Sequence, residues 1–129
     1  MKKVSIRKKL VTKLDKVFGD YIKARDKGRS VLSGKRDNIQ CGHLFSRVAY
    51  STRWDETNAF CQTAGENLRH EHDPWPFYKW YKDVFGDEQF DSLHRKYNTP
   101  TRFSNADLHD LIVYYEKKLE DEDFGEVTW

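Results

Sequence analysis

The sequence predicts a helix-rich α+β domain, in which a small β-hairpin and a helix lie between N-terminal and C-terminal helices. Apolar residues recur at steps of three and four near both ends of the chain, as on the buried face of a helix. Between them, residues 38–54 mix apolar and polar side chains without that period. The 129 residues have the length of one domain, so we expect a single domain over residues 1–129.

The composition excludes several classes of protein. Aromatic residues make up 15% of the chain, whereas disordered chains are poor in them. No stretch approaches the roughly 20 apolar residues that span a membrane. The basic start of the chain lacks the apolar segment of a signal peptide, and two cysteines 20 positions apart give no disulfide framework. We therefore expect a cytoplasmic protein with no membrane partner.

The first predicted element is an amphipathic, basic helix from residue 3 to about residue 26. Its apolar positions have helical spacing: Leu10, Leu14, Val17, Phe18, Tyr21 and Ile22. Lysines, including Lys9 and Lys13, occupy its other faces. Gly28 and Gly34 then predict a loop.

Residues 38–54 predict a short irregular hairpin, because apolar residues there alternate loosely with polar ones. Residues 55–58, with the sequence DETN, predict a turn that leads into a compact connection.

Three helices are predicted after residue 72. Asp73, followed by Pro74, is typical of a helix start, and Gly86 of a helix end. Asp87 is expected to cap a short helix. Ser104 and Asp107 have the spacing of a capping box ahead of the last helix. The apolar residues of these helices are Phe77, Trp80, Tyr81, Val84, Phe90, Leu93, Leu108, Leu111, Ile112, Tyr115 and Leu119. The acidic tail after residue 120 is expected to fray.

The charges divide the chain into a basic and an acidic half. Residues 1–53 hold 15 Lys/Arg and 4 Asp/Glu, and residues 54–129 hold 8 Lys/Arg and 17 Asp/Glu, so the balances are +11 and −9. A basic half favours a polyanionic partner. The alternative is that the basic segment is simply a solvated charged helix.

Four residues in the middle of the chain are candidates for metal-assisted chemistry. His43 lies in a strand-like context and is suited to act as a general base. Asn67 and His70 are three residues apart, on one face of a helical turn, and Asn58 precedes them. Asn oxygen and imidazole nitrogen both bind divalent metals, and a metal polarises a phosphate. The alternatives are a structural histidine, a turn asparagine and a solvated turn at residues 70–72.

The central blocks resemble a known family. Residues 38–47, NIQCGHLFSR, resemble the GHF-x-SR block of the lambda NinG (Rap) family of phage recombination proteins. Residues 53–58, RWDETN, are similar to its RWD-x-x-N block. The similarity continues through residues 67–77 and extends to the first and last helices, so it covers nearly the whole chain.

The resemblance implies an HNH-like (ββα-metal) core and an endonuclease that cuts branched DNA such as Holliday junctions and D-loops. His43 would be the general base, and Asn58 would brace the loop that carries it. Asn67 would bind Mg²⁺ or Mn²⁺, and His70 would be a second ligand or would support the ligands. HNH sites often have an acidic ligand where this chain has Gly42. The first metal ligand is therefore left open among His43 itself, Asp55 and Glu71.

The resemblance also implies a structural zinc that this chain cannot build. The family's two cysteine pairs would fall at four positions occupied by Ser30, Ser33, Thr63 and Glu66. Hydroxyls and a carboxylate do not reproduce a thiolate zinc site, so no structural zinc is expected. Cys41 and Cys61 are predicted to be small buried residues. A less favoured alternative is zinc bound by these cysteines and two histidines.

The predicted partner is branched or double-stranded DNA. Arg47 and Arg53 flank the candidate site and are expected to contact phosphates, unless they form surface ion pairs. Lys9 and Lys13 of the first helix would follow the DNA backbone. The aromatic residues near residue 80 are expected mainly to pack in a core rather than to stack on bases.

Two functions follow from this sequence. The first is a metal-dependent, structure-selective DNA endonuclease in the bacterial host cell of a phage or prophage. Analogy with junction resolvases suggests a homodimer. The second is a branched-DNA-binding protein that has lost its zinc and much of its activity. The expected organisation is a basic helix (1–28), an HNH-like core with a degenerate zinc loop (29–72), a helical part (73–120) and an acidic tail (121–129).

Overall fold

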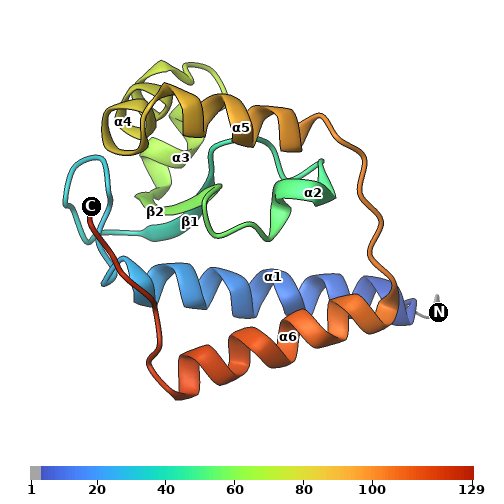
Figure 1. The fold of residues 1–129 in the computed structure, drawn as a ribbon. Coiled ribbons are helices and arrows are strands. Elements are labelled where there is room, and N and C mark those ends of the chain that lie inside the picture. The colour runs from blue at the N-terminus through green and yellow to red at the C-terminus, as the bar shows by residue number, and fades with distance from the viewer. Residues whose placement is uncertain (1–3) are drawn as a thin grey trace.

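The computed structural model describes residues 4–129, which form six helices and one two-stranded sheet (Figure 1). The elements in chain order are α1 (Ile6–Arg25), β1 (Ile39–His43), α2 (Tyr50–Arg53), β2 (Ala59–Thr63), α3 (Ala64–His70), α4 (Trp75–Phe85), α5 (Asp87–Tyr97) and α6 (Asn105–Glu120). The predicted helix-rich α+β class is confirmed. Within residues 4–129, no helix has the length and apolar character needed to cross a membrane.

The hairpin of β1 and β2 lies between two hydrophobic cores. On one side, α1 and α6 lie next to each other and run in the same direction (Figure 1). Arg7 at the start of α1 donates to the Phe103 carbonyl just before α6, and the rings of Tyr21 and Tyr115 pack 5.0 Å apart near the other end. On the other side, Phe60 of β2 packs with Phe77 and other aromatic residues of α4 and α5. Because both faces of the hairpin are covered, its side chains are fixed from two sides.

The hairpin differs from the prediction in its second half. Residues 38–54 were expected to form a short irregular hairpin, but residues 50–53 form the short helix α2. The partner of β1 is β2, with Ile39 opposite Thr63 and His43 opposite Ala59 in antiparallel register. Residues 59–62 are all buried, so β2 lacks the alternation of apolar and polar residues that marks a half-exposed strand.

The three C-terminal helices are confirmed, but two of their predicted caps are wrong. Ser104 and Asp107 form the predicted capping box, with both reciprocal hydrogen bonds present. α4 instead begins after Pro74, without a side-chain cap from Asp73. α5 begins after Gly86, whose φ of 89° is readily available only to glycine. Asp87 is therefore the first residue of α5 and not its cap.

The acidic tail was predicted to fray, and this prediction is wrong. Its aromatic residues pack against the rest of the protein. The ring of Phe124 lies 5.8 Å from that of Tyr21. Trp129 packs against Phe60 and donates from its indole Nε1 to Asp26 at 2.8 Å. The tail thus returns to the end of α1.

A buried ion pair at the end of α1 joins these parts of the fold. Arg25 and Asp26 are each about 5% exposed or less. The Asp26 carboxylate accepts from Arg25, from the Cys61 backbone N–H and from Trp129. Arg25 also donates to the backbone carbonyls of Glu56 and Ala59. One ion pair therefore links α1, the loop before β2, β2 itself and the tail.

We predict that Asp26→Ala lowers the free energy of unfolding by about 3–5 kcal/mol, because it leaves the Arg25 charge buried without its partner. Urea denaturation measures the change. Asp20→Ala is the control, since Asp20 forms an exposed pair with Lys16 that is worth about 0.5 kcal/mol. Equal losses of unfolding free energy in the two variants would show that the buried pair stabilises the fold no more than an exposed pair does.

Candidate functional site

A groove of about 920 Å³ runs beside β1, and most of the residues predicted as a site from the sequence line it. They are His43, Arg47, Arg53, Asn67 and His70, from β1, the loop after it, α2 and α3. Residues distant in the sequence therefore meet on one surface. The groove is open and wide, as expected of a surface for an extended ligand.

His43 is held as a neutral imidazole with one nitrogen free. Its Nε2 donates to the Arg53 carbonyl at 2.9 Å, so in the neutral ring Nδ1 carries the lone pair. Nδ1 has no hydrogen-bond partner among residues 4–129. Burial, partly offset by the hydrogen bond to Arg53, lowers the pKa of His43 from 6.5 to about 4. At neutral pH the ring is therefore neutral, with its lone pair on Nδ1.

Asn58 fixes the loop that follows His43. Its side chain is fully buried behind the groove. The Oδ1 atom accepts from the Phe45 N–H at 2.9 Å, and Nδ2 donates to the carbonyls of Phe45 and Thr52 at 3.0 Å. Because Thr52 immediately precedes Arg53, one side chain positions both the loop after His43 and the helix whose carbonyl holds the His43 ring.

Asn67 has a free oxygen beside the backbone of Gly42. Its Nδ2 donates to the Gln40 side chain at 2.9 Å, and its Oδ1 has no partner in the described part of the chain. A Cβ atom at position 42 would lie 3.2 Å from Asn67 Oδ1 and only 2.7 Å from Nε2 of Gln62. The space that an acidic ligand at position 42 would need is therefore filled by Gln62.

Gln62 is the site residue that the sequence analysis missed. It is fully buried, and neither its Nε2 nor its Oε1 has a hydrogen-bond partner among residues 4–129. A buried side-chain amide without any hydrogen-bond partner is rare in a folded protein. The available signal was a glutamine directly after the apolar run Ala59–Cys61, since a polar residue in a buried segment is informative.

His43 and Asn67 reach the groove from opposite faces of the hairpin. The ring of His43 lies 6.3 Å from that of Phe18 in α1. Gly42, the neighbour of His43 in β1, faces Gln62 and Asn67 instead. Successive strand residues alternate between faces, which accounts for the difference. The groove at the edge of β1 is where the two faces meet.

His70 supports the same loop from the side of α3. Its Nε2 donates to the Leu44 carbonyl at 2.8 Å, and its ring packs edge-on against Phe77. Its Nδ1 is enclosed and has no partner in the described chain. These contacts suit a group that positions the loop after His43.

The residues in the groove could bind a divalent metal only through a small number of protein ligands. Within residues 4–129, no group of three or more His, Cys, Asp or Glu side chains could hold a metal ion. Of the acidic candidates, Glu71 lines the groove, whereas Asp55 is paired with Lys96. Burial alone would raise the pKa of Asp55, but its hydrogen bonds with Lys96 and Thr57 bring it below the usual value. Mg²⁺ keeps several waters and binds through few protein groups plus phosphate oxygens, so Asn67 with substrate fits such an ion.

The predicted DNA-contacting residues differ in whether their side chains are already paired and in whether they line the groove. Arg47 is exposed, and its guanidinium has no partner among the described residues. Arg53 instead forms two hydrogen bonds with Asp15, at 3.0 and 2.5 Å, which raise its pKa. Lys9 and Lys13 are exposed on α1 and do not line the groove. Arg47 is therefore the arginine best placed to meet a phosphate there.

The four positions implied as former zinc ligands form a hydrogen-bonded cluster. The Ser30 hydroxyl donates to Glu66 at 2.6 Å and accepts from the backbone N–H of Ser33. Thr63 and Glu66 form a capping box at the start of α3. Burial alone would raise the pKa of Glu66, but hydrogen bonds with Ser30, Thr63 and Ser33 bring it below the usual value. The carboxylate thus ties the loop at residues 30–34 to α3.

The two cysteines lie opposite each other in the hairpin and are both free. Cys61 is buried as predicted, while Cys41 is only partly buried. Burial raises the pKa of Cys41 to about 12 and that of Cys61 to about 11. Both thiols are therefore protonated at neutral pH, a state that does not favour metal binding.

Comparisons with protein-family models, with curated proteins and with solved structures found no match. The resemblance to the NinG family stays a prediction from the sequence motifs.

We predict that Glu66→Gln lowers the free energy of unfolding by about 1 kcal/mol at neutral pH, because it removes the charge from the cluster. The pKa of Glu66 is lower in the folded protein than in the unfolded chain. Its ionised form therefore stabilises the fold at pH values above the unfolded pKa, and this stabilisation is lost as the pH falls through the folded pKa. The difference between wild type and variant should therefore shrink in acid. Urea denaturation at several pH values measures it. The exposed Glu71→Gln variant is the control, and a pH-independent difference for Glu66→Gln would contradict the assignment.

We predict that Gly42→Ala lowers the free energy of unfolding by about 1–3 kcal/mol, because the new Cβ overlaps Gln62. In a Gln62→Ala background the same change should cost about 1 kcal/mol less, since the obstacle is gone. Urea denaturation of the four proteins gives this coupling. Gly65→Ala is the control, because a Cβ there has nothing within 4 Å. Equal costs of Gly42→Ala in both backgrounds would show that Gln62 does not fill this space.

Proposed function

We propose that this protein is a metal-dependent endonuclease that hydrolyses phosphodiester bonds in branched DNA. The observation that carries the proposal is the state of His43 in the groove. Its Nε2 proton is held by the Arg53 carbonyl, so its free Nδ1 is the proton acceptor, and it shares the groove with Arg47 and Asn67. A fixed neutral base beside a free cation and a free amide oxygen suits attack by water on a phosphodiester.

In the proposed reaction, Nδ1 of His43 takes a proton from the attacking water. The guanidinium of Arg47 contacts a phosphate and stabilises the charge that develops on it. Asn67 would hold Mg²⁺ or Mn²⁺ together with the substrate, and that ion would supply Lewis-acid stabilisation of the phosphate. Asn58 and His70 are positioning residues, since each holds the backbone of the loop after His43.

The choice of branched DNA as substrate rests on the sequence resemblance to the NinG family. Two features of the structure support a nucleic acid in general. The groove is long enough to involve residues from β1, α3 and α5, and its free cation is an arginine. Lys8, Lys9 and Lys13 of α1 are exposed and available for additional contacts with a nucleic-acid backbone.

A second function, binding of branched DNA without cleavage, is favoured by one observation. Gly42 and Gln62 occupy the space of an acidic ligand, and no group of three His, Cys, Asp or Glu metal ligands forms within residues 4–129. Such a site binds a metal weakly before substrate is present. Binding of a four-way junction without cutting, in both Mg²⁺ and Mn²⁺, would support this second function and contradict the first.

We predict that His43→Ala reduces the rate of cleavage of a synthetic four-way junction in Mg²⁺ or Mn²⁺ by about 100-fold or more. Because the pKa of His43 is about 4, protonation of His43 should reduce the wild-type cleavage rate only as the pH approaches 4. Single-turnover cleavage followed on gels, as a function of pH, measures both effects.

His72→Ala is the matched control, since His72 is exposed and lies outside the groove. It should cut like wild type. Junction binding by His43→Ala, measured by gel shift, should be retained, which separates loss of chemistry from loss of folding. Equal cutting by His43→Ala and wild type would show that His43 is not the base.

A further inference from the structure

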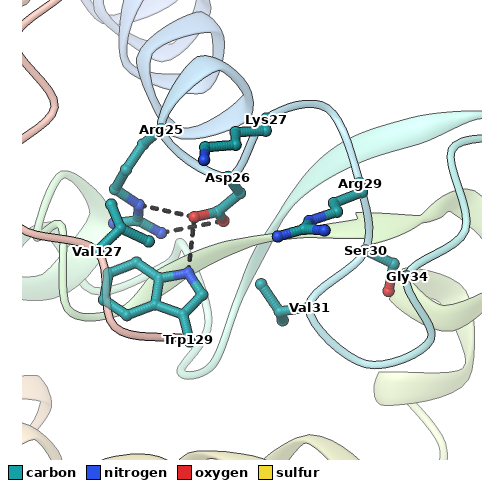
Figure 2. Close-up of a pocket in the computed structure, with 9 residues that line it drawn as sticks. All are labelled: Arg25, Asp26, Lys27, Arg29, Ser30, Val31, Gly34, Val127 and Trp129. Atoms are coloured by element: carbon teal, nitrogen blue, oxygen red, sulfur yellow. Dashed lines mark hydrogen bonds and ion pairs between the residues drawn. The ribbon is translucent and has the colours of Figure 1, made fainter.

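A second hollow lies at the end of α1, away from the groove beside β1. It has a volume of about 280 Å³ and is shown in Figure 2. Its lining comes from three segments: the end of α1, the loop at residues 27–34, and the tail at residues 127–129. None of its lining residues belongs to the groove that contains His43. It is therefore a separate site.

The buried ion pair that forms the floor of this hollow is internally satisfied. Asp26 accepts four hydrogen bonds, from Nε and Nη2 of Arg25, from the Cys61 N–H and from Trp129. Arg25 donates two further hydrogen bonds, to the carbonyls of Glu56 and Ala59. Four of its five N–H groups are therefore used within the protein, and the pair contributes almost no net charge.

Two cations at the hollow remain available. Lys27 and Arg29 are exposed and line it, and their side chains have no hydrogen-bond or ion-pair partner among residues 4–129. Figure 2 shows the guanidinium of Arg29 reaching from the loop toward Asp26 and Trp129. With the Arg25–Asp26 pair neutral, these two side chains make the hollow positive. Free cations at a concave site favour an anionic ligand.

Apolar side chains also line the hollow. Val31 from the loop and Val127 from the tail line it together with the indole of Trp129. Figure 2 shows Trp129 and Val127 facing the loop that carries Arg29. A site of this size, lined by two cations together with aliphatic and aromatic groups, matches a ligand that carries both a phosphate and a sugar or base.

We propose that this hollow binds the terminal phosphate of a nucleotide, with Lys27 and Arg29 contacting the phosphate and Val31, Val127 and Trp129 contacting the nucleoside. The ligand is either a free nucleoside monophosphate or the 5′-phosphorylated end of a DNA strand, which share this chemistry. The site is independent of the proposed cleavage by His43.

The test is a calorimetric titration of the whole protein with deoxyadenosine 5′-monophosphate, deoxyadenosine and inorganic phosphate. The monophosphate should bind about tenfold more tightly than either fragment, because only it makes both sets of contacts. A short single strand with a 5′-phosphate, compared with the same strand ending in a 5′-hydroxyl, distinguishes the two sources. Tighter binding of the phosphorylated strand identifies a strand end as a ligand, and equal binding of the two strands identifies the free nucleotide.

The decisive variant is Lys27→Ala with Arg29→Ala, which should weaken binding of the monophosphate by about tenfold or more. Arg95→Ala with Arg102→Ala removes the same charge from exposed positions outside the hollow and should bind within about twofold of wild type. Both changes are on the surface, and circular dichroism checks the fold. His43→Ala should bind the monophosphate normally. No binding by wild type, or equal weakening in both double variants, would overturn the proposal.

Discussion

The buried pair of Arg25 and Asp26 is the interaction on which the arrangement of this protein depends. A charge taken out of water is costly unless it is paired and hydrogen-bonded, and here all three nitrogens of the Arg25 guanidinium and both oxygens of Asp26 form hydrogen bonds. The partners come from β2, the loop before it and the tail. Satisfying one ion pair thus fixes how α1 meets the hairpin, and it returns the acidic tail to the basic end of α1. Because Arg25 and Asp26 pair with each other, the neighbouring Lys27 and Arg29 remain the free cations.

Backbone carbonyls, rather than acidic side chains, hold both histidines of the groove. His43 donates to the Arg53 carbonyl and His70 to the Leu44 carbonyl. The Arg53 carbonyl fixes the tautomer of His43 and offsets only part of the effect of burial, so the pKa of His43 stays low. Asn58 makes this arrangement rigid, because its buried amide holds the loop and α2 together. The partly buried ring of His43 lines the groove, and Asn58, which fixes the loop after it, is buried behind it.

Polar clusters replace two features that the family resemblance implies. Where a zinc site is implied, Glu66 joins Ser30 to Thr63 through hydrogen bonds and so links the loop at residues 30–34 to α3. Where an acidic metal ligand is implied, Gly42 leaves room that the Gln62 amide fills. Hydrogen bonds of this kind are each worth about 1 kcal/mol, far less than a structural zinc site, so the loop depends more on packing than it would with the metal. In the proposed function, the second replacement would make metal binding depend on substrate.

The sequence by itself determined the helix-rich α+β class, the positions of α1, α4, α5 and α6, and the Ser104 capping box, because these depend on local periodicity and short-range hydrogen bonds. It also singled out His43 and Asn67, which the structure places in one groove. It could not identify β2, whose residues are buried on both faces and so carry no alternation, nor the return of the tail through Trp129. Only the tertiary structure decided that Arg53 is paired with Asp15, that Gln62 lies against Gly42, and that Lys27 and Arg29 are left free. These outcomes depend on which distant side chains meet, and a pairing between residues 35 or more positions apart leaves no local pattern in the chain.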